Sequence, residues 1–228
     1  MALVGALIAG GFAEHQAVKR GAHPFYMIEV LLYGAVGVFL GGHLLYGLVH
    51  IKELKDGFLQ AFGGQVFYGG LLGALAVGAI VIKRKGYPKA LYYDVSATAI
   101  PLFHGFARIG CFLVGCCYGV ESEHGFTYTQ ALIHSANGVN RFPVQLLEAG
   151  LNFVLFGILY ALLRKGRCAG SLLYIYLSCY AVIRFGLEFL RGDYALRGMW
   201  LGLSTSQWIS AAIIAAVLVR TAYKKMAS

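Results

Sequence analysis

Two arginines and a glutamate interrupt an apolar stretch of this chain, Arg184-Phe185-Gly186-Leu187-Glu188-Phe189-Leu190-Arg191. Residues three and four apart share one face of a helix, so Tyr180, Arg184, Glu188 and Arg191 form one polar stripe. The apolar segment around them, 170–190, is long enough to cross a bilayer. A charge at membrane depth costs at least ~2.5–3.5 kcal/mol. The stripe must therefore face a wet or polar cavity, which makes it a candidate functional site.

The composition is that of a membrane protein. The chain has 228 residues, of which 59% are hydrophobic and 13% are charged, whereas soluble domains have about 25% charged residues. The first apolar stretch lacks a basic leader and a clear cleavage site, so we interpret it as a helix and not as a signal peptide. We predict an all-α, polytopic integral membrane protein that forms a single domain over 1–228. Its seven predicted transmembrane helices are 1–13, 26–49, 65–82, 92–119, 143–163, 170–190 and 203–220.

Basic residues are distributed unequally between the two ends of these segments. Five lie on the side of the N-terminus (Lys52, Lys55, Arg141, Arg191 and Arg197), and twelve lie on the other (Lys19, Arg20, Lys83, Arg84, Lys85, Lys89, Arg164, Lys165, Arg167, Arg220, Lys224 and Lys225). Because cytoplasmic loops are enriched in lysine and arginine, the N-terminus is predicted outside and the C-terminus inside. This placement at helix ends explains the formal net charge of +9 without a nucleic-acid partner.

The fourth apolar segment carries an unusual set of polar side chains. His104, Arg108, Cys111 and Gly115 recur at helical spacing and share one face. An arginine in the middle of a membrane segment, beside a histidine and a thiol, is typical of a functional site. Pro101 and the glycines predict that this helix is broken or kinked.

The cysteines of this segment have three open interpretations. Cys111, Cys116 and Cys117 are small buried hydrophobes, or reactive thiols beside an arginine, or zinc ligands. The spacing Cys-x4-Cys-Cys is not a standard zinc pattern, and Cys116 and Cys117 are expected to point to different sides. We therefore predict neither a metal site nor a cofactor.

Other segments add polar or irregular features. The glycines of the second segment favour close helix packing, whereas the five glycines within 62–73 predict an irregular turn around Tyr68 that lines a cavity. The segment 121–142 is predicted to be a polar outside loop. Loops of this length often carry function, and gating of a lateral entrance is one role open to it. Gln145 and Glu148 share a face at the start of the fifth helix, where their expected roles are interhelical hydrogen bonding or a polar site.

The chain resembles the bacterial prolipoprotein diacylglyceryl transferase family over nearly its whole length. The matching stretches occur in the family's order: 31–42, Gly69-Gly70-Leu71-Leu72-Gly73, Arg108-Ile109-Gly110 with Gly115 and Gly119, 142–148, 184–191, and Ser204 with Gln207. The resemblance implies transfer of a diacylglyceryl group from phosphatidylglycerol, or a similar anionic phospholipid, to the cysteine thiol of a prolipoprotein. It also implies a multi-pass protein of the bacterial cytoplasmic membrane.

The resemblance further implies roles for individual residues. Arg108 and Arg184 would clamp the phosphate and the leaving group, Glu188 would orient one of them, and His104, Tyr68 and Cys116 are the remaining catalytic candidates. The candidates for substrate binding are Tyr26, Gly69, Gly70, Cys111, Cys117, Gln145, Glu148, Tyr180 and Arg191.

The chain departs from the family pattern where the acceptor would react. Tyr68 stands where the family usually has a histidine, and with a pKa of about 10 a tyrosine is a poor base at neutral pH. Cys111 and Cys116 replace an asparagine and a glutamate. Three interpretations follow: a divergent transferase with His104 as its base, a paralogue with another acceptor and a covalent or redox cysteine, or a non-catalytic lipid-binding protein.

Overall fold

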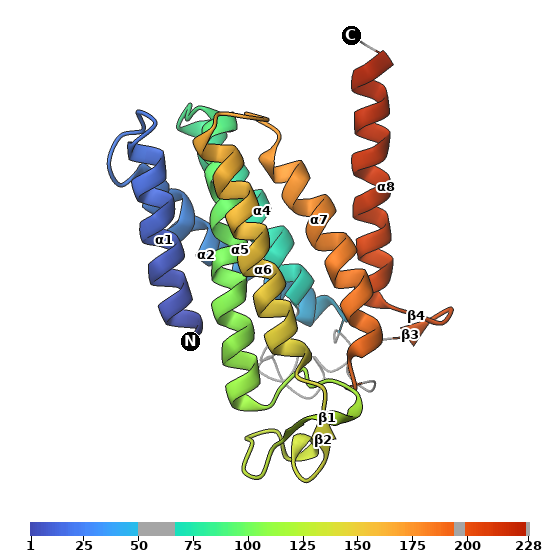
Figure 1. Cartoon of the computed structure of the whole chain (residues 1–228). Coiled ribbons are helices and arrows are strands. Elements are labelled where there is room, and N and C mark those ends of the chain that lie inside the picture. Colours follow the sequence, from blue (N-terminus) through green and yellow to red (C-terminus); the bar gives the residue numbers. More distant parts are fainter. Residues whose placement is uncertain (50–66, 194–198, 227–228) are drawn as a thin grey trace. The chain divides into compact units, whose positions relative to one another are not determined.

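The computed structural model describes residues 1–49, 67–193 and 199–226, and these are largely helical (Figure 1). Each predicted apolar stretch coincides with one α-helix of the described residues. The helices are α1 (Ala2–Val18), α2 (Tyr26–Val49), α4 (Phe67–Arg84), α5 (Lys89–Val114), α6 (Val144–Arg164), α7 (Leu172–Leu187) and α8 (Thr205–Met226).

Five of the described segments are long and apolar enough to cross a membrane. They are Tyr26–Leu48, Lys89–Val114, Val144–Arg164, Leu172–Leu190 and Thr205–Tyr223. Helix α1 has 17 residues and α4 has 18, and neither belongs to this group. The predicted class of polytopic, mostly helical membrane protein is therefore supported, and many apolar side chains lie on the protein surface as a bilayer requires.

The described chain forms two compact units. In the unit Gly10–Tyr92, helices α2 and α4 pack through small residues. A side chain on Gly41 would collide with the backbone of Gly69, and one on Gly73 would collide with the backbone of Gly37. The packing role predicted for the second segment is thus confirmed at Gly37 and Gly41, because only glycine permits such close backbones.

The predicted irregular turn around Tyr68 is wrong for the described residues. Helix α4 begins at Phe67, so Tyr68, Gly69 and Gly70 lie in its first turn. Packing against α2 compensates for the low helix propensity of these glycines. Residues 62–66 of the predicted turn lie outside the described residues.

The second unit consists of Met1–Ala9 with Tyr93–Ser228. Helix α5 is continuous through the fully buried Pro101, so the helix is not broken there; a kink at Pro101, the other form of the prediction, stays a prediction. Surrounding helices can support a proline inside a membrane helix. The helix instead ends at Val114, earlier than predicted, where Gly115 has a φ of +79° that favours glycine.

A buried carboxylate joins α5 to the start of α7. Oδ1 of Asp94 accepts a hydrogen bond from the backbone N–H of Leu172 at 3.0 Å, and Oδ2 accepts one from Gly170. Backbone N–H groups at a helix N-terminus have no partner within the helix, and Asp94 satisfies that of Leu172, the first residue of α7. The contact fixes the axial position of α7 against α5.

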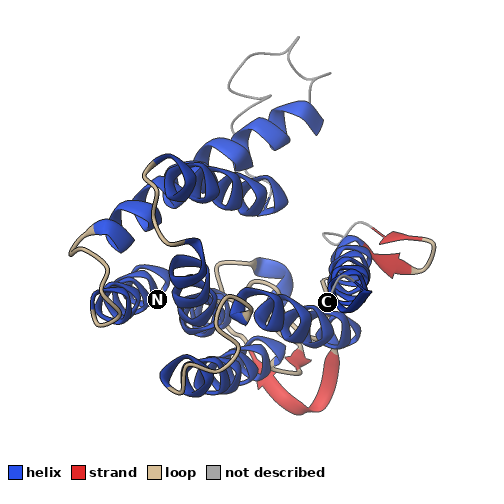
Figure 2. Cartoon of the chain, turned by 90° about the horizontal axis from the view of Figure 1, so that it is seen from above, coloured by secondary structure: helices blue, strands red, loops and turns tan. Residues whose placement is uncertain are grey.

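The predicted outside loop at 121–142 contains regular structure. Strand β1 (Glu121–Thr127) pairs antiparallel with β2 (Asn140–Arg141), and the short helix η2 (His134–Ala136) lies between them. A second pair, β3 (Met199–Trp200) and β4 (Leu203–Ser204), precedes α8. Figure 2 shows both pairs at the margin of the helices.

Backbone hydrogen bonds join the segments that follow α5 and α7. The N–H of Val120 donates to the carbonyl of Leu190 at 3.0 Å, and the N–H of Gly192 donates to the carbonyl of Tyr118 at 2.9 Å. Leu190 ends the short helix η3 (Glu188–Leu190). The connection holds the cysteine-containing end of α5 beside the charged end of α7.

Candidate active site

Helices α5, α6 and α7 meet at a buried ion pair. Nε of Arg108 lies 3.0 Å from Oε2 of Glu148, whose side chain is 4% exposed. The hydroxyl of Tyr180 donates to the other carboxylate oxygen, Oε1, at 3.2 Å. Glu148 is therefore the carboxylate that holds Arg108, a pairing that the sequence analysis did not predict.

The polar stripe of α7 forms a second ion pair. Nη2 of Arg184 lies 2.7 Å from Oε2 of Glu188, four residues later, and also donates to Oγ of Ser206 at 3.2 Å. The expectation that Glu188 orients an arginine therefore has a geometric basis at Arg184. Nη1 of the same guanidinium is buried and has no hydrogen-bond partner among the described residues. A buried donor without a partner is costly unless a ligand satisfies it.

Arg191 extends this cluster beyond the end of α7. Its Nη1 lies 4.0 Å from the Glu188 carboxylate, and its Nε donates to Oδ1 of Asp193 at 2.9 Å. The fold thus balances three arginines with three carboxylates, those of Glu148, Glu188 and Asp193. Asp193 and Ser206 were missed from sequence, although Asp193 follows the stripe by only two residues.

His104 lies within the same group of helices. Its Nδ1 is 3.3 Å from the hydroxyl of Tyr176, and its ring centroid is 5.2 Å from that of Tyr180. Tyr180 in turn contacts Glu148. An aromatic contact with Tyr180, followed by the polar contacts of Tyr180 and Glu148, therefore connects His104 to Arg108. Tyr176 was also missed, and its signal was the helical spacing from Tyr180.

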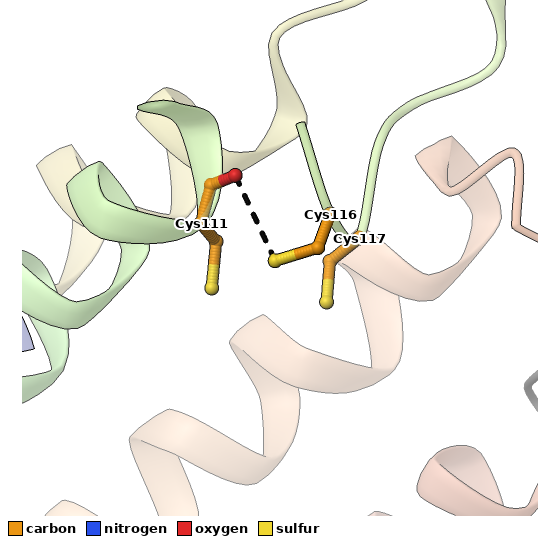
Figure 3. Close-up of side chains that lie close together, drawn as sticks. All are labelled: Cys111, Cys116 and Cys117. Atoms are coloured by element: carbon orange, nitrogen blue, oxygen red, sulfur yellow. Dashed lines mark hydrogen bonds between the residues drawn. The ribbon is translucent and has the colours of Figure 1, made fainter. Parts of the chain in front are cut away.

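The three cysteines at the end of α5 lie together (Figure 3). The Sγ atoms of Cys111, Cys116 and Cys117 are all within 4.8 Å of one another. The expectation that Cys116 and Cys117 point to different sides is wrong, because the backbone reverses after α5: Gly115 has a φ of +79° and Cys117 a φ of +55°. Nη1 of Arg108 lies 3.9 Å from Sγ of Cys111.

Buried polar contacts from α6 support this cysteine turn. Nε2 of Gln145, which is 2% exposed, donates to the carbonyl of Cys116 at 2.9 Å. The pKa of Cys117, which lies beyond the helical segment, is held well below its usual range by hydrogen bonds from Cys111 and Cys116, and the Arg191 and Arg108 cations add to this effect.

The remaining candidates belong to the other unit. Tyr68, Gly69 and Gly70 lie in the first turn of α4. Tyr26 begins α2, where its ring stacks on those of His23 and Tyr87, with centroids 4.6 Å away in each case. The structure describes these residues within their own unit, separately from the arginine cluster.

The fold and this site define a class: a polytopic helical membrane protein with a buried, charge-balanced arginine cluster suited to an anionic group. Comparison with known proteins refines that class. The model of the prolipoprotein diacylglyceryl transferase family matches residues 1–223. The chain therefore belongs to this family of bacterial membrane enzymes.

Several curated relatives share most of this sequence. The chain is 34% identical over 215 residues to the phosphatidylglycerol–prolipoprotein diacylglyceryl transferase of Clostridium tetani, which covers 92% of this chain and 85% of the relative. It is 35% identical to the protein of the same name in Geobacter sulfurreducens, over 89% of this chain and 80% of the relative. It is also 32% identical to a second transferase of that name in Clostridium perfringens, over 87% of this chain and 79% of the relative.

Proposed function

We propose that this protein transfers a diacylglyceryl group from phosphatidylglycerol, or a similar anionic phospholipid, to the thiol of a prolipoprotein cysteine. The relatives, which are phosphatidylglycerol–prolipoprotein diacylglyceryl transferases, support the donor and the acceptor. The observation that carries the proposal is the buried Nη1 of Arg184, a cationic donor without a protein partner among the described residues.

Arg184 is proposed to hold the phosphate of the lipid. Its Nη2 is engaged by Glu188 and Ser206, so the guanidinium has a fixed orientation. Its Nη1 remains available for a phosphate oxygen. Arginine suits this task because its planar group makes strong, charge-assisted hydrogen bonds to phosphate. Arg191 is proposed to add a second positive charge on the same side.

Arg108 is proposed to stabilise the leaving group. When the bond between the glyceryl carbon and the phosphate oxygen breaks, negative charge grows on that oxygen, and the leaving group is glycerol phosphate. A fixed cation aimed at this charge lowers the barrier. Glu148, supported by Tyr180, fixes the direction of Arg108, and Gln145 is proposed to keep the adjacent cysteine turn in place.

The acceptor requires a thiolate, and His104 is the proposed base. It is the histidine that contacts the Tyr180–Glu148 group within the described residues. Its contact with Tyr176 restrains the imidazole orientation. Tyr26, Tyr68, Gly69 and Gly70 are proposed to contact the lipid.

The protein is proposed to act as one domain in the bacterial cytoplasmic membrane, with seven spans, an outside N-terminus and an inside C-terminus. The supporting observation is the excess of lysine and arginine at the proposed inside ends. Reporter fusions test this topology. A C-terminal fluorescent protein should fold and emit, whereas a C-terminal alkaline phosphatase should be inactive, and the reverse result would contradict the orientation.

The proposed activity is tested with purified protein in detergent micelles that contain phosphatidylglycerol. A peptide with a lipobox cysteine should cause release of glycerol phosphate and gain a diacylglyceryl mass, whereas a serine version should not. Substitution of phosphatidylethanolamine is the control for donor charge. Release with other thiols but not with a lipobox peptide would contradict the prolipoprotein acceptor, and absence of release with every thiol would contradict the transferase.

A further inference from the structure

Three thiols at one point are an unusual feature of a membrane site, and the ion-pair network does not require them. Cys111 lies in the last turns of α5, whereas Cys116 and Cys117 follow the helix in a turn that returns toward it. Sγ of Cys116 donates to the carbonyl of Cys111 at 3.7 Å, and Figure 3 shows the three sulfur atoms gathered beside this contact. All three cysteines are free and partly exposed.

The spacing of the sulfur atoms suits a metal ion. In a tetrahedral zinc site with Zn–S bonds of about 2.3 Å, the sulfur atoms lie about 3.8 Å apart. Here all three sulfur atoms lie within 4.8 Å of one another. Side-chain rotations and small backbone shifts of less than about 1 Å would bring them to the distances of a zinc site.

The number of potential ligands indicates which kind of zinc site this cluster could form. Among the described residues, this group contains three potential ligands and no fourth histidine, cysteine or carboxylate. Structural zinc sites usually have four protein ligands, whereas catalytic zinc sites have three and leave one position open. Zinc with three thiolates carries a net negative charge. Arg108, in contact with Cys111, and Arg191, which lies on the segment paired with 119–120, would offset it.

We propose that Cys111, Cys116 and Cys117 bind one zinc ion whose fourth position accepts the thiol of the acceptor cysteine. This inference rests on the proposed function, in which a thiol is alkylated. A thiol that coordinates zinc loses its proton at neutral pH. The site therefore supplies a metal-bound thiolate beside Arg108, which is the arginine assigned to the leaving group.

The transfer balances in atoms and electrons. The acceptor thiol enters the fourth position, and its proton passes to His104, the proposed base. The sulfur then forms a bond to the glyceryl carbon, while the bond between that carbon and the phosphate oxygen breaks. The phosphate oxygen keeps the bonding electron pair, so glycerol phosphate departs and the thioether product leaves the metal. No oxidant or reductant is consumed.

Metal content is the first test. The full chain, purified in detergent with a reductant, should contain about one zinc ion per molecule. Inductively coupled plasma mass spectrometry measures this metal content. Cys111→Ser, Cys116→Ser and Cys117→Ser should each lose most of it. Cys168→Ser and Cys179→Ser are matched controls at exposed cysteines outside the cluster, and both should retain it. Size-exclusion profiles and circular dichroism verify that each variant is folded.

Cobalt substitution tests the open position in the unaltered protein. Co²⁺ bound by three thiolates should give intense visible bands and a sulfur charge-transfer band. A lipobox peptide should shift the visible bands and strengthen the charge-transfer band, whereas the same peptide with serine should leave the spectrum unchanged. An unchanged spectrum with the cysteine peptide would contradict the acceptor role of the metal.

Several results would overturn the metal site itself. The reduced protein could bind neither zinc nor cobalt, or it could retain copper alone. The triple serine variant could contain as much zinc as the parent protein, or a disulfide within the cluster could persist under reductant. The two proposals fail separately. An active but metal-free protein would overturn only the zinc site, whereas a protein that binds zinc and the thiol without releasing glycerol phosphate would overturn only the transferase.

Discussion

Nε of Arg108 on α5 lies 3.0 Å from Oε2 of Glu148 on α6, and the two side chains are 19% and 4% exposed. The pair joins two helices at a depth where an isolated charge is costly. The hydroxyl of Tyr180 adds a hydrogen bond from α7 to the same carboxylate. This arrangement keeps Arg108 charged and fixed in direction, and both properties are needed for binding a developing anion.

Glu148→Ala should lower stability by about 3–5 kcal/mol, because it leaves the Arg108 cation buried without its partner. Thermal unfolding in detergent measures the effect. Glu123→Ala, at an exposed site on β1, is the control and should unfold like the parent protein. The double variant Arg108→Met with Glu148→Leu should recover stability but release no glycerol phosphate. An unchanged unfolding temperature in Glu148→Ala would contradict a structural ion pair.

Arg184→Lys should reduce the rate of glycerol phosphate release by about 10²–10³-fold, the usual effect of removing an oriented donor from a developing anion. Lysine keeps the positive charge but lacks the planar fork that contacts Glu188, Ser206 and the lipid phosphate together. Arg167→Lys changes an exposed arginine between α6 and α7 and serves as the control. Equal rates of glycerol phosphate release in the two variants would contradict the assignment of Arg184 to the phosphate site.

His104→Ala should slow the transfer by about 10²–10⁴-fold if the imidazole accepts the thiol proton. The loss should decrease as the pH rises, because solvent then ionises more of the acceptor thiol without help. His124→Ala, on the exposed strand β1, is the matched control. If His104→Ala transfers the diacylglyceryl group at the rate of the parent protein at every pH, His104 is not the base.

Gly41→Ala should destabilise the protein by about 1–3 kcal/mol, because the new methyl group would meet the backbone of Gly69 in the facing helix. Gly34→Ala, on the same helix, is the control, since no atom lies within 4 Å of its added carbon. That control should be neutral or stabilising, because alanine favours a helix more than glycine does. Equal unfolding temperatures would contradict the close contact of α2 and α4.

Patterns along the chain predicted the helices well, because hydrophobic runs and their interruptions are local. The seven apolar stretches coincide with the seven helices of the described residues. Predictions that depended on one residue's usual tendency were less reliable. Pro101 lies within a continuous helix, and the glycines near Tyr68 also adopt helical structure. In both cases packing against other helices outweighs the intrinsic preference of the residue.

The polar stripe of α7 was visible in the sequence because helical spacing alone places Tyr180, Arg184 and Glu188 on one face. Their partners on other helices were not visible, since Ser206 is 22 residues from Arg184 and Glu148 is 32 residues from Tyr180. Contacts over such distances depend on which helices are neighbours. That choice is made by the packing of whole helices.

The sequence by itself determined that this protein is a helical membrane protein with buried arginines, because a bilayer penalises every charge and every unpaired backbone group. Only the tertiary structure decided that Arg108 pairs with Glu148 on another helix, and that Cys111 meets Cys116 and Cys117. The physical reason is that the end of α5 reverses at Gly115 and is held by bonds to the segment after α7. No local pattern in the chain encodes the contact between this turn and the segment after α7.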